Sequence, residues 1–378
     1  MSDSYTAPPH VNMPRLLQTV VDKGASDLHI TAGTPPQLRI NGDLVPLRTP
    51  VLTPEDTQYL ADSVLSQEQR DKFHETAELD LSFRFSESTR FRANFFFQKM
   101  AVGGVLRIIP SRTLPLADLG FPDSVAELAN KPHGLILVTG PTGSGKSTTL
   151  ASLVDLINRT RHGHIVTIED PIEFVHEHKK CIINQREVGT DTDSFENGLR
   201  HVLRQDPDVV LIGEIRDLIT METALRIAET GHLVFATLHT NNAIQTIHRV
   251  IDFFPAHQQD MIRSQLSFVL EAVISQQLVR RSDKNGRVMV CEIMFPNHAI
   301  RNLIREDKMH QVVSQMQIGQ EGSRMVTLNQ SLLRLVQEGL LNQEQALRRA
   351  YDQDELSGMF AKDDAAKVAG GSKRRGGR

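Results

Sequence analysis

Eight residues near the middle of the chain have the types and spacing of a phosphate-binding loop. Residues 140–147 read Gly-Pro-Thr-Gly-Ser-Gly-Lys-Ser, the pattern G-x-x-x-x-G-K-S. An apolar run at 135–138 precedes them and a helix-like run at 147–158 follows, which is the strand, loop and helix that the pattern requires. Glycines let backbone N–H groups close around phosphates, and the helix N-terminus adds partial positive charge. We therefore predict a site for a nucleoside triphosphate.

The side chains of this loop have separate expected roles. Lys146 can reach the β- and γ-phosphates of ATP, and the Ser147 hydroxyl can bind Mg²⁺. The predicted nucleotide-binding residues of the loop are Gly140, Thr142, Gly143, Ser144, Gly145, Lys146, Ser147 and Thr148.

Acidic residues follow two further apolar runs. Glu214 comes just after the run at 209–212, where a carboxylate can hold Mg²⁺ together with Ser147 or polarise the attacking water. Glu169, Asp170 and Glu173 follow the run at 165–168. Ligands of open α/β sheets lie beyond the carboxyl ends of the strands, so these side chains could converge. Glu173 is the candidate general base; the alternative is that its loop is only a charged turn.

Histidines flank another predicted strand, at 233–237. His232 precedes it and His239 follows it. A histidine at a strand end can hydrogen-bond to the γ-phosphate and relay its presence, and both are candidates for this role. A single histidine, judged alone, is more often structural.

Three arginines in the N-terminal part could supply positive charge to the phosphates. Phe91, Ala93, Phe95 and Phe97 alternate with polar residues along one predicted strand. A period of two therefore places Arg90 and Arg92 on the opposite, non-core face. Arg107 lies inside the next predicted strand. Arginine supplied from another domain stabilises a transferring phosphoryl group, although a solvated strand face is the plainer interpretation.

The elements that must position these residues fall into an α/β arrangement of two domains. Residues 11–109 read as a small α+β domain and 110–122, rich in proline, as a linker. Strands alternating with helices from 123 predict a largely parallel sheet, followed by a helix-rich region from about Asp260 to 355. Residues 1–10 are expected to form a flexible arm and 356–378 a flexible basic tail.

Composition narrows the function classes. The 378 residues carry a net charge of −4, which argues against a general nucleic-acid binder. No apolar stretch approaches the roughly 18 residues of a membrane span, and no signal peptide is apparent. Two distant cysteines exclude a zinc or disulfide framework and fit a reducing, cytoplasmic setting. The basic tail is interpreted as solvated, or as a weak attachment to an anionic membrane face.

Four blocks in order resemble the secretion and type IV pilus motor ATPases: GPTGSGKST, TIEDPIEF, VVLIGEIRD and ETGHLVFATLHT. They match that family's Walker A, Asp box, atypical Walker B and His box. Residues 25–30, ASDLHI, and 299–306, AIRNLIRE, are similar to motifs of its pilus-retraction subgroup. The likeness spans roughly residues 11–350; the arm and the tail lie outside it.

The resemblance implies a homohexameric ring, peripheral to the cytoplasmic side of the inner membrane, that hydrolyses ATP with Mg²⁺ and acts through a membrane platform protein. It implies a PAS-like N-terminal domain and a RecA-like P-loop domain, with ATP between them and Arg92, Arg107 and Arg90 near the phosphates. Glu173 and Glu214 would shape hydrolysis, and His232 and His239 would sense the nucleotide.

Other functions remain open at this point. A pilus-extension or type II secretion ATPase usually carries a longer N-terminal region and a four-cysteine zinc module, which this chain lacks. An accessory retraction ATPase shares the same blocks. A scaffold that binds nucleotide without hydrolysing it is disfavoured by Glu173 and Glu214, and a DNA motor by the negative charge.

Overall fold

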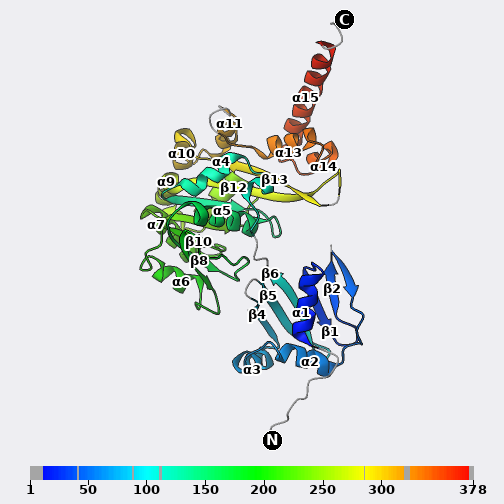
Figure 1. The fold of residues 1–378 in the computed structure, drawn as a ribbon. Helices are drawn as coiled ribbons and strands as arrows, with labels where there is room; N and C mark the ends of the chain where they lie inside the picture. Colours follow the sequence, from blue (N-terminus) through cyan, green and yellow to red (C-terminus); the bar gives the residue numbers. More distant parts are fainter. Residues whose placement is uncertain are drawn as a thin grey trace. The chain divides into compact units, whose positions relative to one another are not determined.

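The computed structural model describes residues 12–40, 42–86, 89–109, 113–284, 286–318 and 324–373. The chain divides into two compact units. The first consists of Met1–Arg112 with Glu173–Val175, and the second of Thr113–Ile172 with His176–Arg378. Each unit is built on its own sheet, shown in Figure 1. The predicted arm, residues 1–10, lies outside the described residues.

The first unit has a six-stranded antiparallel sheet in the order β3-β2-β1-β6-β5-β4. Its strands are β1 Asp27–Thr31, β2 Gln37–Ile40, β3 Asp43–Pro46, β4 Glu78–Ser86, β5 Thr89–Gln98 and β6 Ala101–Ile109. Its helices are α1 Met13–Asp22, α2 Pro54–Asp62 and α3 Gln67–Thr76. Capping boxes start α2 at Thr53 and α3 at Ser66, because each side chain accepts a hydrogen bond from the third helical N–H.

Aromatic residues make the core of this unit. Phe91 and Phe95 of β5 are fully buried and pack with Phe73 of α3, as the alternation along the strand predicts. The α+β character expected of this domain is therefore confirmed.

The second unit has a seven-stranded sheet in the order β13-β12-β7-β11-β10-β8-β9. Its neighbouring strands are parallel except for the antiparallel pair β12 and β13. The strands are β7 Gly134–Thr139, β8 Gly163–Glu169, β9 Cys181–Glu187, β10 Val209–Ile212, β11 Leu233–Leu238, β12 Leu270–Arg280 and β13 Arg287–Met294. The four strands predicted between 135 and 237 are all present, and the α/β class is confirmed.

Helices cover both faces of this sheet (Figure 1). Leu135 and Leu137 of β7 belong to the core cluster that α6–α9 complete, whereas Ile136 and Val138 belong to the cluster of α4 and α5. The helices are η1 Leu116–Leu119, α4 Asp123–Ala126, η2 Glu127–Asn130, α5 Lys146–Thr160, α6 Phe195–Val202, α7 Leu218–Glu229, α8 Ala243–Asp252, η3 Ala256–Gln258 and α9 Gln259–Val269.

The C-terminal third is helix-rich, as predicted, but it also adds two strands to the sheet. After α9, which ends at Val269, β12 and β13 form a hairpin that extends the sheet. Most of β12 is buried, so it lacks the alternation that would identify a half-exposed strand. Helices do follow: α10 His298–Arg305, η4 Met309–Gln311, α11 Val312–Gln317, α13 Leu328–Gln337, α14 Gln343–Leu347 and α15 Gln353–Lys373.

Two expected boundaries also differ. The predicted flexible tail from 356 is helical as far as Lys373, within α15, and 374–378 lie outside the described residues. Of the predicted linker 110–122, the described part from Thr113 belongs to the second unit and contains η1. In the part of the chain that the structure describes, no helix combines the length and hydropathy of a membrane span.

Candidate nucleotide site

The predicted phosphate loop connects the end of β7 to the start of α5. Gly143 and Gly145 have φ values of 76° and 93°, a left-handed conformation that side chains other than glycine rarely adopt. Gly145 stands immediately before α5 and has no side chain with which to cap it. The first N–H groups of an α-helix have no partner within the helix, so this end is suited to an anion. The loop therefore fits the phosphates predicted for it.

The polar side chains of the loop have distinct surroundings. Lys146 Nζ donates to the carbonyl oxygens of Gly140 and Pro141, at 2.8 and 3.2 Å, so it lies along the loop. Ser144 is buried, and its Oγ has no hydrogen-bond partner among the described residues. Thr142 is exposed, whereas Ser147 and Thr148 are partly buried in the first turn of α5.

Glu214 lies at the same edge of the sheet, just beyond the end of β10. Arg216 Nη2 donates to Glu214 Oε2 at 2.8 Å, and His239 Nε2 lies 3.1 Å from Glu214 Oε1. The hydrogen bond from Arg216 is the main reason that the pKa of the Glu214 carboxyl is lowered. Glu214 is thus held as a carboxylate with two nitrogen donors around it, and Arg216 also lies 3.8 Å from Asp170.

Parallel strands bring these residues to one edge. The loop follows β7, His239 follows β11, Glu214 follows β10 and Asp170 follows β8, in the order of the sheet. Two strand spacings, roughly 10 Å, separate the ends of β7 and β10. Thr237 of β11 donates to Gly213 O, and Gly213 N donates to Ile168 O, which ties the strand ends together. Glu169 instead accepts from Thr167 and Gln185.

His232 is not part of this cluster. His232 precedes β11, whose six residues span roughly 20 Å, so within one chain it lies at the opposite edge of the sheet. Its Nδ1 lies 3.1 Å from Ile227 O and from Thr230 Oγ1, contacts that hold a helix end. Glu173 is exposed on the segment after β8 and belongs to the first unit.

The three arginines share one face of the first unit's sheet. Arg92 of β5 stands directly opposite Arg107 of β6 in the strand register, and Arg90 is two residues away on β5. Arg107 Nε donates to the buried Asp27 at 2.7 Å, Arg92 lies 4.0 Å from Asp80, and Arg90 donates to Ser82. Arg90 and Arg92 thus share a strand face as predicted, and the register adds Arg107 beside Arg92.

Sequence reasoning missed two residues of the site. Arg216 lies inside a recognised block, but only its 2.8 Å bond shows that it holds Glu214. Gln276 comes from β12, a strand that was not predicted within the helix-rich region, and hydrogen-bonds to the phosphate loop. Gln276 lies in the polar triplet Ser275-Gln276-Gln277, and nothing in its local pattern distinguishes it from its neighbours.

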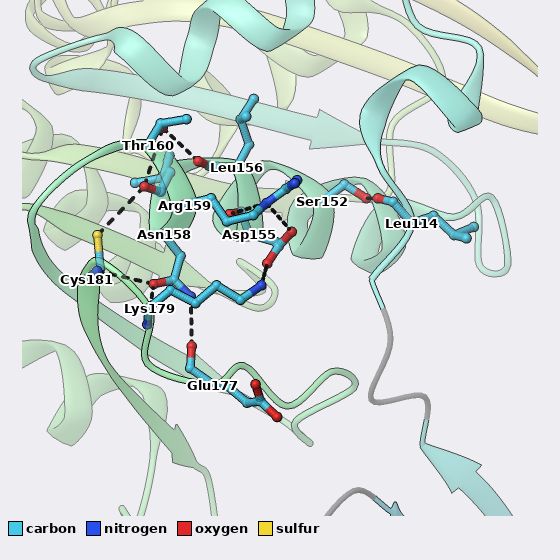
Figure 2. Close-up of polar contacts among 11 residues, drawn as sticks. Leu114, Ser152, Asp155, Leu156, Asn158, Arg159, Thr160, Glu177, Lys179 and Cys181 are labelled. Atoms are coloured by element: carbon cyan, nitrogen blue, oxygen red, sulfur yellow. Dashed lines mark hydrogen bonds and ion pairs between the residues drawn. The ribbon is translucent and has the colours of Figure 1, made fainter.

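The far end of α5 is tied down by polar contacts (Figure 2). Asn158, fully buried, donates to Glu177 O at 2.7 Å and accepts from the backbone N–H groups of Lys179 and Cys181. Asp155 forms ion pairs with Lys179 and Arg159. These contacts attach α5 to the segment that leads into β9.

Comparisons with known proteins agree with this geometry. A model of the family described as "Type II/IV secretion system protein" matches residues 7–348. The Pseudomonas aeruginosa "Type IV pilus retractation ATPase PilT" is 49% identical over 341 residues, covering 90% of this chain and 98% of that protein. A Neisseria gonorrhoeae "Twitching motility protein" is 48% identical over 322 residues, covering 85% of this chain and 86% of that protein.

A solved structure supports the same grouping. The "Crystal Structure of the Pilus Retraction Motor PilT and Bound ADP" superposes with a TM-score of 0.87 at 52% identity, over 92% of this chain and 99% of that one. Fold, phosphate loop and sequence thus agree. The chain belongs to the type II/IV secretion system protein family.

Proposed function

We propose that this chain is an ATP-hydrolysing motor that powers the retraction of type IV pili. One observation carries the proposal. The glycine-rich loop 140–147 leads into α5, whose N-terminus has no side-chain cap. At the same edge of the sheet lies Glu214, whose carboxyl pKa is lowered mainly by the hydrogen bond from Arg216. Relatives of near-full-length similarity are named for pilus retraction and twitching motility, and one of their structures contains ADP.

The residues take roles that follow from their chemistry. The N–H groups of residues 143–148 and Lys146 bind the phosphates. Ser147 and Glu214 would hold Mg²⁺, since Mg²⁺ at phosphates takes only one or two protein ligands; the bound ion neutralises phosphate charge. Glu214 orients or polarises the attacking water, and His239, bonded to Glu214, senses whether the γ-phosphate is present. Glu173 is proposed as the general base.

The remaining assignments rest on the family. Arg92 and Arg107, with Arg90 beside them, supply positive charge to the transferring phosphoryl group. His232, at the opposite edge of the sheet within one chain, is the weakest of the proposed nucleotide contacts. The motor works as a homohexamer, peripheral to the cytoplasmic face of the inner membrane, on a platform protein of the pilus machine. Hydrolysis drives rigid-body movement of domains, which performs the mechanical work.

The test combines one substitution with two readouts. Glu214→Gln keeps the side-chain shape but removes the charge, so the purified variant should bind MgATP and lose turnover by about 10²-fold or more. Glu222→Gln on α7 removes an exposed carboxylate and is the control. Turnover of Glu214→Gln equal to wild type would contradict the assigned role.

Imaging of labelled pili in a strain lacking the protein separates the related functions. Pili should extend without the protein, and the wild-type chain, but not Glu214→Gln, should restore retraction. Absence of pili in the deletion strain would instead indicate an extension or secretion ATPase. Unchanged retraction would indicate an accessory motor.

A further inference from the structure

Strand β12 lies directly behind the phosphate loop. It runs parallel to β7, with Ser275 opposite Thr139, the last residue of β7. A Cβ added at Gly140 would lie 2.2 Å from Gln276 O, far closer than atoms can approach. The backbone at the start of the loop is therefore in contact with the backbone of β12, and only glycine fits at residue 140.

The side chain of Gln276 crosses from β12 to the loop. It is 1% exposed, and Nε2 donates to Ser144 O at 2.8 Å. Its Oε1 accepts from Thr149 Oγ1 at 3.0 Å, and Thr149 is equally buried. One amide thus joins a carbonyl of the loop to a hydroxyl on α5. We call these two hydrogen bonds the loop bridge.

The loop bridge determines the orientation of one peptide group. Ser144 C=O and Gly145 N–H belong to the same planar, trans peptide, so they point in opposite directions. Because Gln276 holds the carbonyl toward β12, the Gly145 N–H must point away from β12. A second peptide orientation at this place would leave Gln276 Nε2 and Ser144 O buried without partners, which costs about 1–3 kcal/mol for each group.

We propose that Gln276 is a positioning residue for nucleotide binding, which keeps the Gly145 N–H turned toward the bound phosphates. This inference rests on the nucleotide site of the proposed function. Gln276 touches no phosphate itself; it acts through Ser144 and Gly145. Preformed N–H donors bind an anion without a cost of rearrangement, which is how such a residue raises affinity.

The experiment uses the purified full-length protein and Gln276→Met, which keeps the length of the side chain and removes both hydrogen bonds. Dissociation constants for MgADP and MgATP are measured by calorimetry, and ATP turnover gives KM and kcat. We expect both dissociation constants and KM to rise about tenfold, the equivalent of one net hydrogen bond, while kcat at saturating ATP stays within twofold.

Ser275→Ala is the matched control. Ser275 is adjacent on β12, equally buried, and shares a 2.8 Å hydrogen bond with Thr139 of β7. Both variants should melt a little earlier than wild type, but only Gln276→Met should lose affinity. Equal affinity losses in the two variants, or a wild-type dissociation constant in Gln276→Met, would overturn the proposal.

The other end of the loop bridge gives a second test. Thr149→Val should weaken MgADP binding, Thr149→Ser should restore it, and Gln276→Met combined with Thr149→Val should be no weaker than Gln276→Met alone. Independent, multiplying effects would contradict a single bridge. If the wild-type chain neither binds nor hydrolyses ATP, the proposed function fails; if it does both and these variants match it, only this inference fails.

Discussion

The two ends of α5 differ in how many of their polar groups have partners. At its N-terminus, Gly145 leaves the helix without a side-chain cap, and Ser144 Oγ is buried without a partner among the described residues. Toward its C-terminus, the side-chain amide of Asn158 makes three hydrogen bonds, and Asp155 forms ion pairs with Lys179 and Arg159 (Figure 2). We call the N-terminal end at Gly145 the incomplete end, because its helical N–H groups are left available for a ligand. We call the C-terminal end at Asp155 and Asn158 the saturated end, because the polar groups of these side chains have partners.

The contrast teaches how one helix can be both a binding site and a fixed support. Unpaired N–H groups raise affinity for an anion only if the helix that carries them does not move away. Polar contacts at Asn158 and Asp155 anchor it to the segment before β9, and Ser152 donates to Leu114 O at 2.6 Å. Changes at the two ends should therefore separate: one set alters nucleotide chemistry and the other alters stability.

The largest effect is expected at the incomplete end. Lys146→Ala removes the ammonium group nearest the phosphates and should lower ATP turnover about 10²- to 10³-fold, with little change in melting temperature. Lys180→Ala, which removes an exposed lysine next to the saturated end, should leave turnover unchanged. Substantial ATPase activity in Lys146→Ala would remove the distinction between the ends.

At the saturated end, Asn158→Ala should cost stability. It leaves the N–H groups of Lys179 and Cys181 and the carbonyl of Glu177 without their partner, a loss of about 3 kcal/mol or more. Urea denaturation measures the change. If the protein remains folded, its dissociation constant for MgADP should stay near that of wild type, and a tenfold weakening would show that the two ends are not separable.

The same region should make stability depend on pH. Burial lowers the pKa of His176 from 6.5 to about 4, so the folded chain keeps it neutral. Between pH 6.5 and 4 the unfolded chain binds the proton and the folded chain does not. Stability is therefore complete above pH 6.5 and falls with pH, by at most about 3 kcal/mol near pH 4.

Substitution of His176 tests whether this residue causes the dependence of stability on pH. His176→Gln should flatten the fall in unfolding free energy measured by urea denaturation at pH 7 and pH 5. His162→Gln, at an exposed histidine, should retain the wild-type slope. Identical slopes in all three proteins would place the effect elsewhere.

The smallest effect is expected at Arg159, where Asp155 keeps Lys179 as a second cation. Arg159 is half exposed and pairs with Asp155 one helical turn away, at 2.9 Å. Arg159→Ala should cost only about 0.3–0.5 kcal/mol in urea denaturation. A loss as large as that of Asn158→Ala would mean that the saturated end depends on charge rather than on hydrogen bonds.

Local patterns predicted most elements around the site. The alternation in β5 and the apolar runs of four parallel strands are patterns of neighbouring residues, so the sequence alone predicts these strands. Strand β12 was not recognised, because Ser275, Gln276 and Gln277 interrupt its apolar run and its burial leaves no regular alternation. The helical course of α15 through the expected tail was missed since its Gly-rich end resembles a linker.

Residue types at short spacing were enough to predict the phosphate loop, its strand and helix, and the carboxylate after β10. Which of these residues lie close together depends on the fold. It joined Glu214 to Arg216 and His239, placed His232 at the far edge, and brought Gln276 from 132 residues away to Ser144. Such contacts depend on the order of strands in the sheet, which no local pattern encodes.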